Sequence, residues 1–179
     1  MVDPVAARLW SYRLLFVALI ALFAFLRLLP LDTVPGGVPG PDFMVALTFA
    51  WVLRRPAYVP AALIVALFLV ADLIFSHPPG VGAALVLLSS EFLRRRQAIS
   101  RELPFLAEWF MVSLLLAFMV IGEQLILAMT LVDRPLLTQS GLRAILTALS
   151  YPLIVAFSSF VFGVRKATPD EVSALGARL

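Results

Sequence analysis

Few side chains of this sequence could do chemistry, and the most notable of them lie in apolar runs. Asp72 comes near the end of one apolar run, and Glu123, followed by Gln124, lies deep inside another. A charge inside an apolar helix is costly and often marks a functional site. For Asp72, a functional role and a structural one stay open; the structural role is to cap the turn at 76–80 or to pair with Arg27. For Glu123, an interhelical hydrogen bond from a protonated carboxyl is the favoured interpretation.

No combination of these residues fits a common catalytic mechanism. An intramembrane aspartyl protease needs a second aspartate in a Gly-x-Gly-Asp setting, and the sequence has none. Zinc-binding HExxH, the GxSxG nucleophile turn and a phosphate-binding loop are also absent from the sequence. His77 is the single histidine, in an expected exposed turn, and there is no cysteine for a thiolate site or a disulfide. We therefore expect no enzyme, no cofactor and no metal.

Composition places the chain in a membrane. Of its 179 residues 62% are hydrophobic and 14% charged, with a mean hydropathy of +1.02, whereas soluble domains have about 25% charged residues. The pI is near 10, but the net charge is only +3 and the basic residues form short clusters between apolar runs. That pattern is typical of membrane orientation and argues against a nucleic-acid partner.

Six apolar runs predict an all-α, polytopic membrane protein with one integral domain over residues 1–179. The expected spans are about 14–29, 43–55, 58–75, 81–93, 105–132 and 142–164. The first is expected as a retained span, since no small-residue cleavage site follows it. The second run is short for about 30 Å of hydrocarbon, so it either extends into its flanks or is re-entrant. Pro152 is expected to kink the last span.

The distribution of basic residues favours six complete crossings. With six spans, eleven basic residues lie on one side of the membrane and three lie nearer the other. The first side would hold Arg8, Arg13, Arg54, Arg55, Arg94, Arg95, Arg96, Arg101, Arg165, Lys166 and Arg178, and the second Arg27, Arg134 and Arg143. Because cytoplasmic loops carry the excess of Lys and Arg, the first side and both termini are expected in the cytoplasm.

Several residues near the expected cytoplasmic ends of the spans are predicted to be structural. Glu91 precedes Arg94 and Arg95 at the spacing of an intrahelical ion pair. Glu108, close to the start of the fifth span, is expected to be structural too. All three tryptophans fall near such ends and are expected to anchor the chain at the membrane interface: Trp10, Trp51 and Trp109.

From Pro41 onward the order of short motifs resembles the MreD family of rod shape-determining membrane proteins. The matching motifs are Pro41-Asp42 at the start of the second span, Arg55-Pro56 after it, Asp72 with Leu73 near the end of the third, and Pro79-Gly80 in the following turn. The resemblance covers about 41–96, and the first, fifth and sixth spans match only as hydrophobic runs. Family members often carry glycine just before the aspartate, whereas 68–71 of this chain reads Phe-Leu-Val-Ala.

The resemblance implies a non-enzymatic part of the cell-wall elongation machinery in the bacterial cytoplasmic (inner) membrane. Its partner would be MreC, a single-span protein with a periplasmic coiled coil. Through MreC it would connect the actin-like MreB filament with the peptidoglycan polymerase and transpeptidase. Asp42, Asp72 and the turn at 76–80 would face the periplasmic partner. The arginine cluster, Arg94, Arg95 and Arg96, would face anionic lipid or cytoplasmic partners.

Two other interpretations remain open. Six short-looped helices are also similar to the substrate-binding subunits of energy-coupling-factor vitamin transporters, a fold that MreD proteins are thought to share. Asp72 and Glu123 would then line a ligand cavity, although the outer loops show no compact group of polar and aromatic residues to hold a vitamin. The third interpretation is a membrane protein with a structural role alone.

Overall fold

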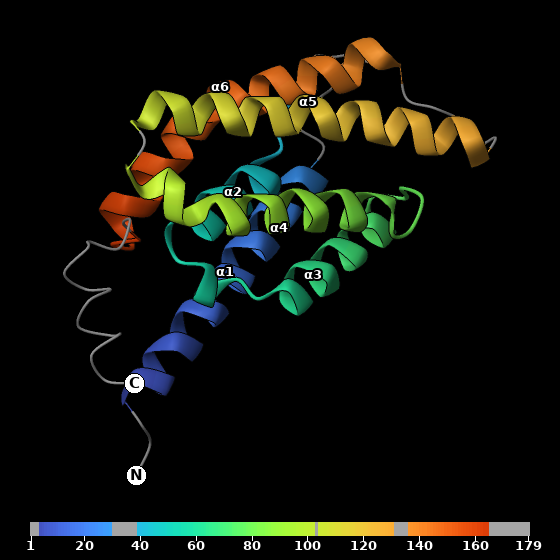
Figure 1. Ribbon diagram of the computed structural model, residues 1–179. Coiled ribbons are helices and arrows are strands. Elements are labelled where there is room, and N and C mark those ends of the chain that lie inside the picture. Colours follow the sequence, from blue (N-terminus) through green and yellow to red (C-terminus); the bar gives the residue numbers. More distant parts are fainter. Residues whose placement is uncertain (1–3, 30–38, 103, 131–135, 165–179) are drawn as a thin grey trace.

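The computed structural model describes residues 4–29, 39–102, 104–130 and 136–164. These residues form six α-helices and one short 3-10 helix (Figure 1). The elements are α1 (Pro4–Leu28), α2 (Phe43–Arg54), η1 (Pro56–Tyr58), α3 (Ala61–Ile74), α4 (Val81–Glu102), α5 (Phe105–Thr130) and α6 (Leu137–Val161). The predicted all-α class with six helices is therefore confirmed.

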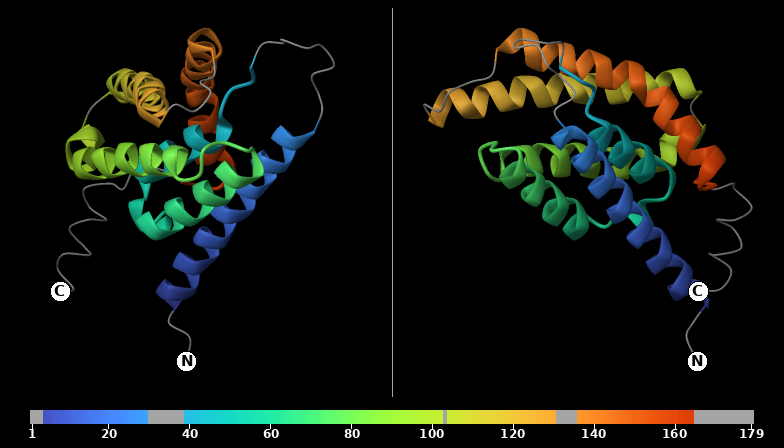
Figure 2. Two further views of the ribbon diagram at one scale, coloured as in Figure 1. Left: turned by 90° about the vertical axis from the view of Figure 1, so that its right-hand side faces the viewer. Right: turned by 180° about the vertical axis from the view of Figure 1, so that it is seen from behind.

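Successive helices run in alternating directions and form a bundle with two distinct ends (Figures 1 and 2). The basic end is the one where α2, α4 and α6 finish, and the turn end is the one where α3 finishes and α4 begins. Among the described residues, α1, α5 and α6 contain stretches long and apolar enough to cross a membrane: Ala6–Leu28, Phe105–Met129 and Leu137–Val161. These three helices indicate a multi-pass membrane protein, and α2 and α3 are shorter apolar helices.

The helices differ from the predicted spans mainly at their ends. The first begins at Pro4, before its expected start at 14. The fourth continues past its expected end at 93, through the arginine cluster, to Glu102, and the sixth begins at Leu137, before its expected start at 142. Hydrophobicity marks only the apolar part of a helix, whereas Arg, Gln and Glu also favour helix and prolong it. Pro152 lies inside α6, which bends in its C-terminal half (Figure 2).

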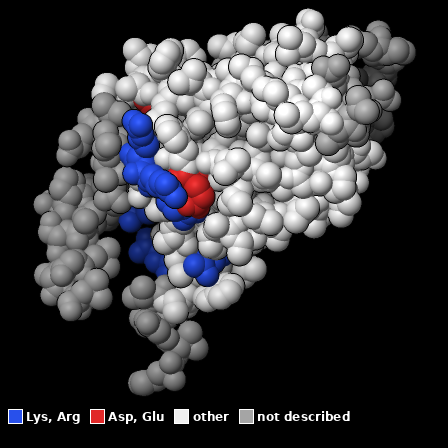
Figure 3. All heavy atoms as spheres, turned by 45° about the vertical axis from the view of Figure 1, so that its right-hand side comes forward, with Lys and Arg blue, Asp and Glu red and all other residues white. Residues whose placement is uncertain are grey.

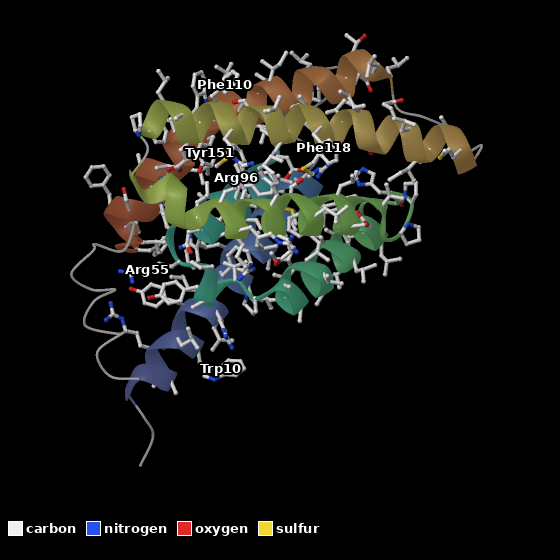
Figure 4. All side chains as sticks on the ribbon, viewed as in Figure 1. Trp10, Arg55, Arg96, Phe110, Phe118 and Tyr151 are labelled. Atoms are coloured by element: carbon white, nitrogen blue, oxygen red, sulfur yellow. The ribbon has the colours of Figure 1, made fainter. Side chains whose placement is uncertain are left out.

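The second helix is the centre of the core. Every residue of α2 from Met44 to Arg54 is buried, enclosed by α1, α4 and α6. Trp51 is fully buried and its Nε1 donates a hydrogen bond of 3.2 Å to Ser158 Oγ, so its prediction as an interface anchor was wrong. Trp10 is exposed and points away from the bundle (Figure 4). A helix enclosed by protein is apolar on all faces, which explains why its sequence looked like a membrane span.

Candidate functional site

A cavity of about 380 Å³ lies at the turn end of the bundle. Residues of all six α-helices and of the α3–α4 turn line it. Its polar lining consists of Arg27, Asp42, Asp72, Ser76, His77, Gln139, Ser140, Arg143, Thr147 and Glu123. The sequence showed no compact polar cluster in the outer loops, because these side chains come from α1, the start of α2, α3, the α3–α4 turn, α5 and α6 and meet only after folding.

Asp72 uses its carboxylate to close the α3–α4 turn. Its side chain is nearly inaccessible, and Oδ2 accepts the backbone N–H groups of Gly80 at 3.0 Å and Ala83 at 3.2 Å. These groups belong to the N-terminus of α4, which has no earlier carbonyl to bond them. Asp72 thus fills the capping role expected as one of its alternatives, and its ion pair with Arg27 is not formed.

Glycines on the far side of the turn allow this approach. Gly80 adopts a φ of 90°, a region that favours glycine. A Cβ atom at Gly82 would collide with Asp72 Oδ1. The residues before Asp72 include no glycine, whereas many members of the resembled family have one there. In this chain the glycine that faces Asp72 is Gly82 of α4. Pro79 is exposed at the tip of the turn.

Asp42 joins three helices at the same end. Its Oδ1 accepts the N–H of Val45 at 3.1 Å and caps α2, and its Oδ2 pairs with Arg27 Nη1 of α1 at 3.4 Å. The backbone N–H of Asp42 donates to Thr147 Oγ1 of α6 at 2.8 Å. Arg27 also lies over the ring of Phe75, 4.2 Å from its centroid. The two charges are therefore engaged with each other, in a pair that stays partly exposed.

Glu123 and Arg143 face the cavity from neighbouring helices. Glu123 lies on α5 and Arg143 on α6, and both are half-buried. Neither side chain forms an ion pair or a hydrogen bond with a residue that the structure describes, so the interhelical hydrogen bond expected for Glu123 is absent there. Gln124, beside Glu123, is half-buried and does not line the cavity.

His77 is half-buried in the turn and lines the cavity, which corrects the expected exposed position. Burial lowers the pKa of its imidazole below the ordinary value of 6.5, and the charges of Arg27 and Arg143 lower it further. Asp72 and Asp42 oppose this shift with smaller effects. The ring is therefore neutral at pH 7.

A second group of polar side chains is buried near the basic end. Glu108 of α5 is fully buried, and its Oε1 accepts from Arg54 Nη1 of α2 at 2.8 Å and from Tyr151 Oη of α6 at 2.6 Å. Figure 4 labels Tyr151 on the inner side of α6. Glu108 was predicted to be structural, and its buried hydrogen bonds agree with that role. Glu108 was expected near the membrane interface and Arg54 on the cytoplasmic side, whereas both are buried inside the bundle. The sequence did contain one signal for the group of Arg54, Glu108 and Tyr151. Arg54 and Glu108 were both expected near the cytoplasmic ends of their spans, and so at a similar depth in the membrane.

The arginine cluster is only partly available to lipid. Arg94 donates to Pro56 O at 3.1 Å, to Val59 O at 2.8 Å and to Glu91 Oε1 at 3.0 Å, which confirms the predicted intrahelical ion pair. Arg94 therefore holds α4 against the α2–α3 connection and is only partly exposed. That it faces anionic lipid or a cytoplasmic partner stays a prediction. Arg95 and Arg96 are exposed. Figure 3 shows basic side chains gathered at this end of the visible face.

Arg55 and Pro56 form the joint between α2 and α3. Arg55 is the C-terminal cap of α2, and its backbone N–H donates to Trp51 O at 2.7 Å. Pro56 starts η1, where its missing N–H costs nothing. Figure 4 shows Arg55 at the basic end. These two residues thus set the angle between two helices.

In the part of the chain that the structure describes, no three His, Cys, Asp or Glu side chains are grouped so that they could hold a metal ion. Comparison with protein-family models, with curated proteins and with solved structures gives no match. The resemblance to the MreD family therefore rests on the motifs in the sequence and stays a prediction.

Proposed function

We propose that this chain is a non-enzymatic component of the cell-wall elongation machinery in the bacterial cytoplasmic membrane. It binds an MreC-like single-span protein and, through it, takes part in organising the MreB-like filament and the peptidoglycan polymerase and transpeptidase. The observation that carries the proposal is that each of the resembled motifs lies at a helix boundary between α2 and α4. Asp42 begins α2, Arg55 and Pro56 end it, and Asp72 with Gly80 closes α3 onto α4.

The surface between the two ends suits a partner inside the bilayer. Helix α5 exposes a row of large apolar side chains at intervals of four residues: Leu106, Phe110, Leu114 and Phe118. Figure 4 labels Phe110 and Phe118 on this helix. Helices in lipid associate through close packing and interhelical hydrogen bonds, and a single-span partner can pack against such a row.

Affinity purification from native membranes in mild detergent, with mass spectrometry of the co-purifying proteins, tests the proposal. Recovery of a single-span coiled-coil protein with wall-synthesis enzymes is the expected result. Loss of that protein when Leu114→Ala and Phe118→Ala are combined would place it on α5. Leu153→Ala combined with Phe160→Ala, two exposed apolar side chains of α6, is the matched control. Recovery of none of these proteins from wild-type membranes contradicts the proposal.

One observation favours a second candidate, the substrate-binding subunit of an energy-coupling-factor transporter. The cavity at the turn end is lined by Asp72 and Glu123, as that interpretation requires. The same purification separates the two candidates, since paired ATPases and a transmembrane coupling subunit would then be recovered. A folded Asp72→Asn variant that keeps its partner would remove Asp72 from the candidate partner-binding residues.

A further inference from the structure

We propose that the cavity at the turn end binds a zwitterionic group: a phosphate or carboxylate and a primary ammonium on one molecule with an apolar body. Arg143 and Glu123 carry this inference. They lie on adjacent helices, line the same cavity and form no ion pair or side-chain hydrogen bond with any described residue. The site is the same in either candidate function, so this inference does not depend on the proposed partner.

The other charges around the cavity are already engaged. Arg27 and Asp42 pair with each other, and Asp72 bonds the backbone of α4. One guanidinium and one carboxylate remain. If an anion alone bound, Glu123 would face a partly desolvated site without a partner. If a cation alone bound, Arg143 would lack a partner in the same way. A molecule with both charges satisfies the two groups with charge-assisted hydrogen bonds.

The rest of the cavity lining determines what kind of ligand body fits between the two charged groups. It is apolar and includes Met44, Phe68, Leu85, Leu116 and Met119. The volume of about 380 Å³ lies within the range of roughly 300–1,000 Å³ of small-molecule sites. Two sources share the required chemistry: the phosphoethanolamine headgroup of a phospholipid, with the start of its acyl chains, and a free amino acid with a large apolar side chain.

Binding to the full-length protein in detergent, measured by thermal shift and native mass spectrometry, tests the site. The probes are dihexanoyl-phosphatidylethanolamine and phenylalanine, with dihexanoyl-phosphatidylglycerol as an anionic lipid without the ammonium. At least one zwitterionic probe is expected to bind at least about tenfold more tightly than the glycerol lipid. Arg143→Gln and Glu123→Gln should each weaken that binding about tenfold or more. Arg95→Gln, an exposed arginine of α4 outside the cavity, should leave it unchanged.

The outcomes separate the sources and can overturn the inference. Binding of the ethanolamine lipid alone identifies a lipid headgroup, and binding of phenylalanine alone identifies a solute; both support the site. Three results would overturn the inference. They are equal affinity for the glycerol lipid, binding that neither substitution weakens, and no binding of either zwitterionic probe. Circular dichroism and gel filtration check folding. If the Gln variants do not fold, Arg143→Lys and Glu123→Asp replace them, with weakened binding expected.

Discussion

The carboxylates in the apolar part of this chain are stabilised in different ways. Asp72 accepts backbone N–H groups, Asp42 pairs with Arg27, and Glu108 accepts from Arg54 and Tyr151. Each arrangement supplies the hydrogen bonds without which a desolvated charge is costly. Glu123 lacks such a partner among the described residues, which sets it apart as a group available to a ligand.

The buried pair of Arg54 and Glu108 should be much more sensitive to losing one member than to losing both. Glu108→Leu leaves the Arg54 charge buried without its carboxylate, and we expect a loss of about 3–5 kcal/mol in the free energy of unfolding. The double variant with Arg54→Met removes both charges and should lose less than Glu108→Leu alone. Denaturant titration in mixed micelles, followed by tryptophan fluorescence, measures both. A Glu108→Leu protein as stable as wild type contradicts the role of the pair.

His77 should make the protein less stable in mild acid. Its pKa in the folded protein is lowered, so the unfolded chain binds more protons and stability falls as the pH drops through about 6.5. Burial is the main cause, and the positive charges of Arg27 and Arg143 add to it. Between pH 7.5 and pH 5.5 the melting temperature of the wild type should fall more than that of His77→Asn. Since His77 is the single histidine, equal falls would refute this.

At the scale of the helix, the sequence predicted which segments are helical better than it predicted what surrounds each helix. The second and fifth apolar runs, 43–55 and 105–132, match α2 and α5 closely. The burial of α2 could not be predicted, because lipid and protein interior are equally apolar and select the same side chains. The short length of α2 was the available signal. The cavity could not be predicted either, since its polar side chains are far apart in the sequence and each looks isolated.

The α3–α4 hairpin depends on a small residue at Gly82. In Gly82→Ala the new methyl group meets the Asp72 carboxylate, which must move away from the α4 N-terminus. We expect a loss of about 1–3 kcal/mol in stability, the usual cost of overpacking. Gly141→Ala is the control: it lies in α6 with nothing within 4 Å of the added Cβ, and should be neutral or stabilising by up to about 1 kcal/mol. Similar melting temperatures for the two variants would show that the close approach does not matter.

At the scale of the whole molecule, polar groups gather near the two ends of the bundle. Charged and polar side chains line the cavity at the turn end, and Arg94, Arg95 and Arg96 lie in the C-terminal half of α4, toward the basic end. Between these ends the visible surface in Figure 3 is largely free of charge. Such a surface suits a bilayer, where exposed apolar side chains contact lipid and charges lie near the headgroups.

The orientation of the molecule follows from the positive-inside rule and can be tested directly, because the sequence has no cysteine. Ala57 is exposed in η1 at the start of α3, and Ser76 is exposed in the turn that follows α3. The excess of arginine predicts that the basic end lies in the cytoplasm. In spheroplasts, a membrane-impermeant maleimide should therefore label Ser76→Cys at once and Ala57→Cys only after the membrane is permeabilised. The opposite labelling would invert the molecule and place the cavity on the cytoplasmic side, and labelling of both before permeabilisation would mean that α3 does not cross the membrane.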